Sequence, residues 1–365
     1  MDKEKAVKQI RDHFIRTVSR DKGIRNAYYY VCSRKQDIDL KMAWGKTGDF
    51  PADSDQPYFI ASIGKLFTAV LAGILTEKAG LSFDDPVSSH LEESILKGLH
   101  VFKGKDYSGE IKISQLLNHT SGLPDYFEDR PKNGKPMLEL IKEEPNRAYG
   151  PVGLVNWSKE NLVPHFPPGK GFHYSDTGYQ LLGLVLEKVA GMPLHQAMEQ
   201  HIFKPLGMKN TFLYHDFSNL DKLEKPVANV FLKDLDVTRY GILLDDYAGG
   251  GVVGTSEDLL KFIRCLVHHI LLKKETFQKM QGWVRHTGWK FMGIDYGYGL
   301  MRFKTIPLLM PRKYIMWGNM GSIGSVLLYH PDTQTYFIGC LNQFRSTRKM
   351  VRIVLRSVDI ILKNQ

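Results

Sequence analysis

The tetrapeptide Ser62-Ile63-Gly64-Lys65 stands at the start of a strongly helical pattern. From residue 63 to residue 79 apolar side chains recur at helical spacing, and Gly80 ends the pattern. Because positions i and i+3 share one face of a helix, the Ser62 hydroxyl and the Lys65 amine are predicted to meet in the first turn. That turn also offers unpaired backbone N–H groups and the positive end of the helix dipole. An amine held there among apolar residues can have its pKa lowered and act as a base.

Outward from this helix, strand-like segments lie toward both ends of the chain. Residues 26–32 are aromatic and β-branched, and a second candidate covers residues 40–44. His330-Pro331-Asp332-Thr333 is typical of a tight turn, which predicts an antiparallel hairpin around it. Together these patterns predict an α/β (α+β) fold with one antiparallel sheet built from both termini. The strand candidates near the C-terminus are residues 298–303, 314–317, 325–329 and 335–341.

Helical patterns fill the middle of the chain. They cover residues 113–117, 179–189 and 194–203, and a further helix is capped by Thr255-Ser256-Glu257-Asp258. Residues 124–170 are rich in Pro, Gly and charge and predict an irregular excursion. We therefore expect a single domain over residues 1–365, with a sheet lobe at 1–60 and 285–365 and a mainly helical lobe at 61–284.

Composition excludes several classes of protein. The chain has 365 residues, 43% of them hydrophobic and 24% charged, which is typical of a globular protein and not of a disordered one. Its longest apolar stretch, residues 69–75, is far shorter than the roughly 20 residues of a membrane span. The net charge is +10, but the basic residues are interleaved with 39 acidic ones, so no nucleic-acid partner is expected. The three cysteines lie far apart and predict no disulfide framework. With Met1 as the native start, the absence of a signal-like apolar core predicts a cytoplasmic protein.

Two later motifs make the Ser62-Ile63-Gly64-Lys65 tetrapeptide a stronger indication of a catalytic site. They are His173-Tyr174-Ser175-Asp176 and Trp317-Gly318-Asn319-Met320-Gly321-Ser322. With S-x-x-K, they resemble the three signatures of the serine β-lactamase and penicillin-binding-protein superfamily. Four lesser stretches resemble its class C β-lactamase, DD-peptidase and esterase branch, in the usual order, at residues 116–124, 166–169, 202–208 and 248–251. The resemblance implies a β-lactamase/transpeptidase-like fold, with helices flanking the sheet and an inserted helical lobe.

The resemblance also implies an acyl-enzyme mechanism. Ser62 would be the nucleophile. Lys65 would help to deprotonate it or maintain the local electrostatic field. Tyr174 would be the general base or proton relay, stabilised as a phenolate by the neighbouring lysine. The backbone N–H groups of Ser62 and Ser322 would stabilise the oxyanion. The stretch containing Asn319, Gly321 and Ser322 would form a strand edge that pairs with an extended substrate.

The chain departs from the family pattern at two positions. Asp176 stands where the family often has Asn, so its contact with Lys65 becomes an ion pair, which favours Tyr174 as the final base. Asn319 stands in place of Lys or His and offers a dipole where a substrate carboxylate needs a cation. This favours neutral esters or amides unless Arg312 or Lys313 compensates.

Other interpretations are weaker, and three functions stay open. Residues 249–254 fit GxGxxG by letters but lack a βαβ unit, which argues against a dinucleotide site. His119 is expected to bond a loop, and His268-His269 lacks a carboxylate at metal-ligand spacing. No metal or organic cofactor is expected, and the partner is a small molecule or short peptide. The open functions are an esterase or D-amino amidase or peptidase, a β-lactamase or D-alanyl-D-alanine carboxypeptidase, and a non-catalytic ligand-binding relative.

Overall fold

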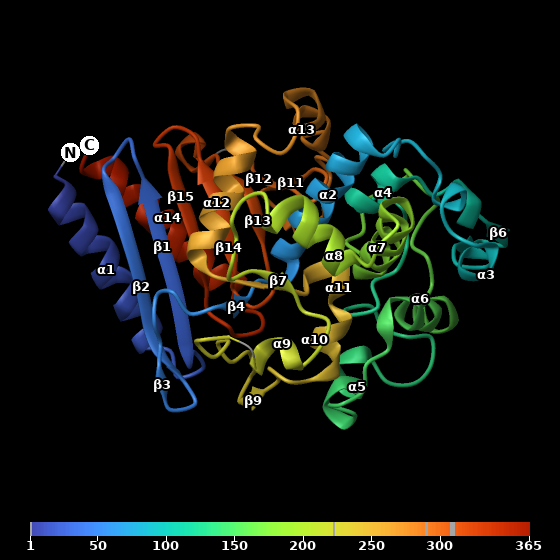
Figure 1. Ribbon diagram of the computed structural model, residues 1–365, viewed down its shortest axis with the longest axis horizontal. Helices are drawn as coiled ribbons and strands as arrows, with labels where there is room; N and C mark the ends of the chain where they lie inside the picture. The colour runs from blue at the N-terminus through green and yellow to red at the C-terminus, as the bar shows by residue number, and fades with distance from the viewer. Residues whose placement is uncertain (1, 222, 289–290, 307–310) are drawn as a thin grey trace.

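An eight-stranded antiparallel sheet joins the two ends of the chain, in the order β11-β12-β13-β14-β15-β1-β2-β3 (Figure 1). In this computed structural model, which describes residues 2–221, 223–288, 291–306 and 311–365, β1 pairs with β15 on one side and β2 on the other. Tyr30, for example, lies opposite both Ile338 and Lys41. The prediction of one sheet from both termini is confirmed. Its strands are β1 (Asn26–Ser33), β2 (Ile38–Thr47), β3 (Phe50–Pro51), β11 (Ile294–Tyr296), β12 (Met301–Phe303), β13 (Trp317–Met320), β14 (Val326–His330) and β15 (Thr335–Cys340).

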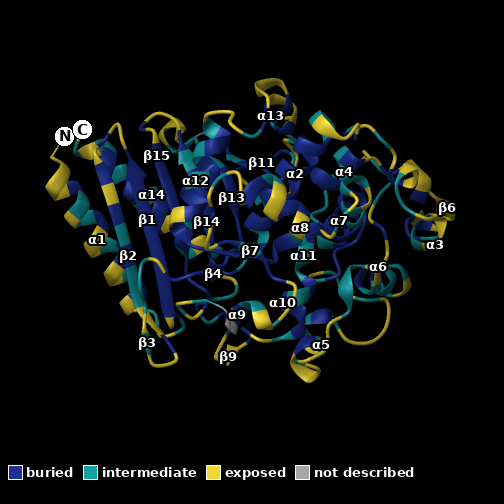
Figure 2. Ribbon diagram, in the orientation of Figure 1, coloured by how far each residue is buried: buried dark blue, intermediate teal, exposed yellow. Residues whose placement is uncertain are grey.

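Both faces of the central strand β1 are covered, and all its residues are buried. Side chains alternate between the faces of a strand. Ala27, Tyr29 and Val31 accordingly share a hydrophobic cluster with α1 (Lys3–Ser19) and α14 (Thr347–Lys363). Tyr28, Tyr30 and Cys32 belong to a second hydrophobic cluster, which contains buried apolar residues of α2 (Gly64–Lys78), α7 (Asp176–Ala190) and α12 (Ser256–Val267). Strand β1 is therefore dark blue along nearly all of its length in Figure 2.

The helix α2 (Gly64–Lys78) lies in the interior of the molecule. Every residue from Gly64 to Leu75 is buried, as expected for a helix that is apolar all round. It packs against α7, α8, α11 and α13. The other α-helices are α3 (Glu93–Leu96), α4 (Ile113–Leu117), α5 (Met137–Glu143), α6 (Gly150–Asn161), α7 (Asp176–Ala190), α8 (Leu194–Met198), α9 (Ser218–Asp221), α10 (Gly241–Asp245), α11 (Tyr247–Gly250), α12 (Ser256–Val267) and α13 (Lys274–Met280).

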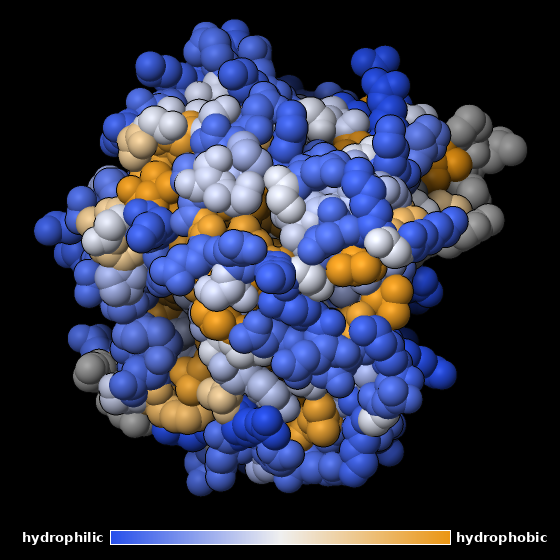
Figure 3. All heavy atoms as spheres, turned by 90° about the vertical axis from the view of Figure 1, so that its right-hand side faces the viewer, coloured by the Kyte–Doolittle hydropathy of each residue, from blue (hydrophilic) through white to orange (hydrophobic). Residues whose placement is uncertain are grey.

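Short strands and turns complete the fold. A three-stranded sheet has the order β4-β10-β7, and β5-β6 and β8-β9 form separate pairs. Within the described ranges, no helix combines the length and the apolarity needed to cross a membrane. On the end of the molecule remote from β1 and β2, hydrophobic side chains form small areas separated by hydrophilic ones (Figure 3). The short strands are β4 (Tyr58–Phe59), β5 (Val101–Phe102), β6 (Lys105–Asp106), β7 (Phe212–Leu213), β8 (Phe231–Leu232), β9 (Leu235–Asp236) and β10 (Val252–Gly254).

The structure differs from the sequence prediction in several places. Residues 124–170 contain α5 and α6 and are not irregular throughout; Pro151, in the first turn of α6, has the fixed φ that suits a helix start. The strand expected at residues 314–317 begins only at Trp317, because residues 312–314 form a 3-10 turn. The helix α12, which the predicted division assigned to the helical lobe, packs against β1, β14 and β15.

Candidate active site

Ser62 lies on a tight turn between β4 and α2. The residue before it, Ala61, has φ 47°, which is uncommon for a residue with a side chain and costs conformational energy. Two glycines allow the surrounding chain to approach this turn. A β-carbon at Gly250 would lie 2.8 Å from the Ala61 carbonyl carbon, and one at Gly321 would lie 2.9 Å from the Ala61 Cβ. The turn holds Ser62 half-buried at the start of α2.

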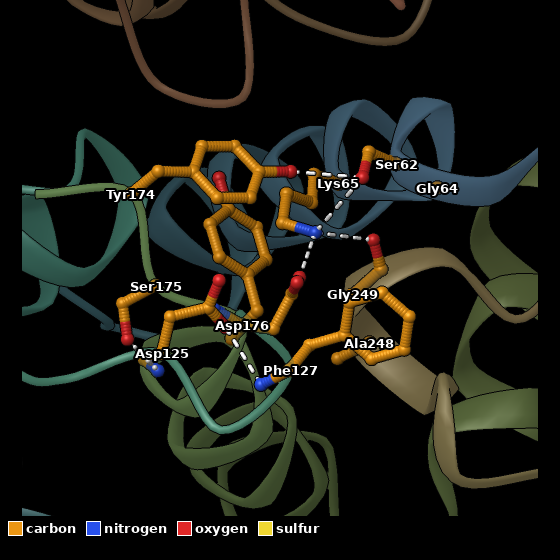
Figure 4. A network of polar contacts seen from close by, with 12 residues as sticks. Ser62, Gly64, Lys65, Asp125, Phe127, Tyr174, Ser175, Asp176, Ala248 and Gly249 are labelled. Atoms are coloured by element: carbon orange, nitrogen blue, oxygen red, sulfur yellow. Dashed lines mark hydrogen bonds and ion pairs between the residues drawn. The ribbon is translucent and has the colours of Figure 1, made fainter. Parts of the chain in front are cut away.

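Lys65 lies one turn further on, with 0% of its side chain exposed. Its Nζ lies 3.4 Å from the Ser62 Oγ and 2.7 Å from the Gly249 carbonyl oxygen, and it forms an ion pair with Asp176 (Figure 4). The contact predicted from the i, i+3 spacing is therefore present. Burial opposes the lysine charge, but the Asp176 carboxylate outweighs it and holds the pKa of Lys65 above its usual value. Lys65 is accordingly an ammonium group at neutral pH.

The Tyr174 hydroxyl faces the same serine. Its Oη donates a hydrogen bond to the Ser62 Oγ at 2.8 Å, and the Lys65 Nζ lies 5.0 Å from the centre of its ring. Burial, followed by the Asp176 charge, raises the pKa of Tyr174 well above its usual value. The raised pKa favours the neutral phenol of Tyr174 over the phenolate expected from the sequence, because burial and the Asp176 charge both oppose a negative charge on its oxygen.

The segment that carries Tyr174 is fixed through His119. The His173 N–H donates to the His119 carbonyl oxygen at 2.9 Å, and the Ser175 N–H donates to the His119 Nδ1 at 3.1 Å. The His119 ring also lies 4.2 Å from the Tyr174 ring, centre to centre. Ser175 then caps α7, because its side chain accepts from the Gly178 N–H. These contacts aim Tyr174 at Ser62 and put Asp176 in the first turn of α7, where a negative charge is favoured.

Two further carboxyl groups lie near Asp176, and sequence reasoning missed both. The Asp125 Oδ1 accepts from the Asp176 N–H and the Phe127 N–H, each at 3.2 Å. Burial and the Asp176 charge raise the pKa of Asp125 well above its usual value. Burial likewise raises the pKa of Asp246 to about 7, with Asp176 adding to the effect. The three aspartates stand on separate segments of the chain, so no local motif connects them.

The end of β13 lies against the Ser62 turn. The Gly321 N–H donates to the Ser325 carbonyl oxygen at 2.9 Å, and the Ser325 Oγ donates to the Ile60 carbonyl oxygen at 2.7 Å. Ser322, the next residue, is half-buried. Asn319 is fully buried, and its Nδ2 donates to the Gly299 carbonyl oxygen at 2.7 Å. Its Oδ1 also accepts from the Met320 N–H, so both ends of the carboxamide are engaged inside the protein.

A cavity of about 90 Å³ opens beside Tyr174. Three of its lining residues, Asp125, Glu128 and Asp129, carry carboxyl groups, and its described lining contains no lysine or arginine. Lys313, named above as a compensating cation, pairs with Asp359 on α14. The cavity wall is therefore acidic and aromatic. Its remaining lining residues are Phe172, His173, Tyr174, Thr287 and Phe291.

Known proteins with similar sequences include a penicillin-binding protein and a beta-lactamase. The chain is 29% identical over 261 residues to penicillin-binding protein 4* of Bacillus subtilis (strain 168), covering 68% of this chain and 53% of that protein. It is 26% identical over 243 residues to a beta-lactamase of Providencia stuartii, covering 67% and 55%. The chain thus spans about half the length of these curated relatives.

A solved structure matches over nearly the whole chain. The D-stereospecific amidohydrolase from Streptomyces sp. superposes with a TM-score of 0.75 at 26% identity, covering 95% of this chain and 97% of that one. The family model described as beta-lactamase matches residues 12–357. The chain therefore belongs to the beta-lactamase family.

Proposed function

We propose that this chain is a serine hydrolase that cleaves a small ester or amide through an acyl-enzyme. The observation that carries the proposal is that the Tyr174 hydroxyl and the Lys65 amine both lie beside the Ser62 hydroxyl oxygen. The Ser62 Oγ accepts from the Tyr174 Oη at 2.8 Å and lies 3.4 Å from the Lys65 Nζ. A hydroxyl with a proton-transfer partner and a fixed positive charge beside it is the arrangement of an activated nucleophile.

The neutral state of Tyr174 favours a relay over a free base. In acylation, the Ser62 Oγ attacks the substrate carbonyl carbon and its proton passes to the Tyr174 Oη. The phenol proton passes at the same time to the leaving oxygen or nitrogen, so Tyr174 remains neutral. Water then attacks the acyl-enzyme and the protons return along the same route. The Ser62 and Ser322 N–H groups are the proposed donors to the oxyanion.

The surroundings of the site favour neutral or amine-bearing substrates. A penicillin or a peptide ending in D-alanine carries a carboxylate, which needs a cation nearby. Asn319 is buried, Lys313 is paired elsewhere, and the cavity beside Tyr174 is acidic. The likeness to a D-stereospecific amidohydrolase supports a D-amino amide or similar compound as the first substrate to test.

Covalent labelling tests the proposal directly. Wild type and Ser62→Ala are exposed to a fluorophosphonate, and the intact proteins are weighed. We expect one adduct on wild type and none on the variant, followed by turnover of esters or D-amino amides. No adduct on folded wild type would overturn the proposal and favour a ligand-binding relative. Faster turnover of β-lactams than of these substrates would favour the β-lactamase alternative.

A further inference from the structure

Three side chains outside the proposed mechanism meet beside the active site. The Asp129 Oδ2 accepts hydrogen bonds from the Nε2 atoms of His165 and His173, at 2.8 and 2.9 Å. One ligand atom from each residue lies within 4.8 Å of the other two. Two imidazoles and a carboxylate are a donor set that suits zinc.

The backbone holds these three residues against one short segment. The Asp129 N–H donates to the Asp125 carbonyl oxygen at 3.0 Å, and the His165 N–H to that of Gly122 at 2.9 Å. The His173 N–H donates to the carbonyl oxygen of His119, also at 2.9 Å. The Asp125 N–H in turn bonds the Asp129 Oδ2 at 2.8 Å. The carboxylate thus has the outer hydrogen bond that orients metal ligands in proteins.

We propose that Asp129, His165 and His173 bind a Zn²⁺ ion. Three protein ligands leave a fourth position for water or for a group of a bound molecule. Bonds of about 2.0–2.1 Å in tetrahedral geometry separate the ligand atoms by about 3.3 Å, so the present contacts must open by about half an ångström. The imidazole rings, stacked with centres 3.5 Å apart, must turn as well. Each Nε2 proton moves to the Nδ1 or leaves to solvent, because the metal takes the Nε2 lone pair.

The position of this site connects it with the cavity beside Tyr174. Asp129 and His173 both line that cavity, together with the carboxyl groups of Asp125 and Glu128. A divalent cation there brings positive charge to a wall that is otherwise acidic. The ion would therefore govern which charged compounds can approach Tyr174.

Metal titration of the untagged, chelator-treated full chain tests the site. ZnCl₂ is added and binding is followed by calorimetry and by native mass spectrometry. Co²⁺ serves as a second probe, because its visible absorption reports its ligands. We expect one Zn²⁺ per wild-type chain, and a loss of affinity of about tenfold or more in both His165→Ala and Asp129→Asn. His165 retains 37% side-chain exposure, so its replacement is compatible with folding, which circular dichroism checks.

A second pair of stacked histidines supplies the matched control. The rings of His195 and His215 lie 3.9 Å apart, but these residues are not part of the three-ligand group. His195→Ala should therefore bind zinc as wild type does. Absence of stoichiometric binding by wild type, or equal affinity in wild type, His165→Ala and Asp129→Asn, would overturn the proposal. Because binding is measured without turnover, this result is independent of the Ser62 labelling.

Discussion

The ion pair between Lys65 and Asp176 allows a quantitative test of the site. The lysine side chain is fully buried, whereas 13% of the aspartate side chain is exposed. Asp176→Asn keeps the size and an oxygen acceptor but removes the negative charge. Removing one partner of a buried pair costs about 3–5 kcal/mol, because the remaining charge is left without compensation. We expect a loss of this size in the free energy of unfolding near pH 6, measured by urea denaturation.

The loss should shrink as the pH rises. In wild type the pKa of Lys65 is raised, so the stabilisation is present at neutral pH and disappears only above about pH 10. In the variant, Asp176 no longer offsets the burial of Lys65, so the pKa of Lys65 falls below its wild-type value. Above the lowered pKa the folded variant has released a proton that the unfolded chain still binds, so its stability rises with pH. The difference from wild type should be clearly smaller near pH 9 than near pH 6.

An exposed pair provides the control for this experiment. Lys135 and Glu143 form an ion pair with about half of each side chain exposed (52% and 51%). Glu143→Gln should leave the free energy of unfolding unchanged at both pH values. A loss below about 1 kcal/mol in Asp176→Asn, or one that is the same at both pH values, would refute the assignment of a buried, charge-compensated lysine.

Three further predictions concern other groups of the site. Tyr174→Phe should lower kcat/KM by about 10² or more while the fold is kept, and full activity would exclude Tyr174 as the relay. In Gly321→Ala the new β-carbon would lie 2.3 Å from the Ser325 Oγ. The substitution should lower the free energy of unfolding, measured by urea denaturation, by about 1–3 kcal/mol and should reduce turnover. Gly109→Ala is the control and should change neither, because nothing lies within 4 Å of a β-carbon there. Burial raises the pKa of Asp246 to about 7, so the folded state keeps a proton that the unfolded chain loses from about pH 4. Wild-type Tm should therefore fall as the pH rises from about 4 to about 7, and Asp246→Asn should flatten that fall; parallel curves would contradict the shift.

The parts of the fold that were predicted correctly are those with local signals. The period of α2, the aromatic and β-branched run of β1, and the turn at residues 330–333 each specify an element within a few residues. The contact between Ser62 and Lys65 follows from helical spacing alone. The helix α6 was missed because glycine, proline and charge within residues 124–170 are equally typical of loops.

The electrostatics of the site depend on contacts between distant segments. Asp125 and Asp246 come close to Asp176, the ion-pair partner of Lys65, only after the chain has folded, so the raised pKa of Tyr174 could not be derived from the motif. The same holds for Asp129, His165 and His173, whose spacing matches no metal-binding pattern. The burial of Asn319 and the hydrogen bond from its carboxamide to the Gly299 carbonyl oxygen likewise depend on a distant segment and could not be read from the motif.

The pairing of β1 with β15 has a consequence for biogenesis. Tyr28 lies opposite Cys340, so the middle of the sheet cannot close until the segment around residue 340, more than 300 residues after β1, has been synthesised. Until then the hairpin of β1 and β2 presents an open edge of unpaired N–H and C=O groups and an uncovered row of tyrosines. Contacts of such long range slow folding and leave intermediates prone to aggregation. The long separation between β1 and β15 thus leaves the β1–β2 hairpin with an unpaired edge for most of the synthesis of the segment that completes the sheet.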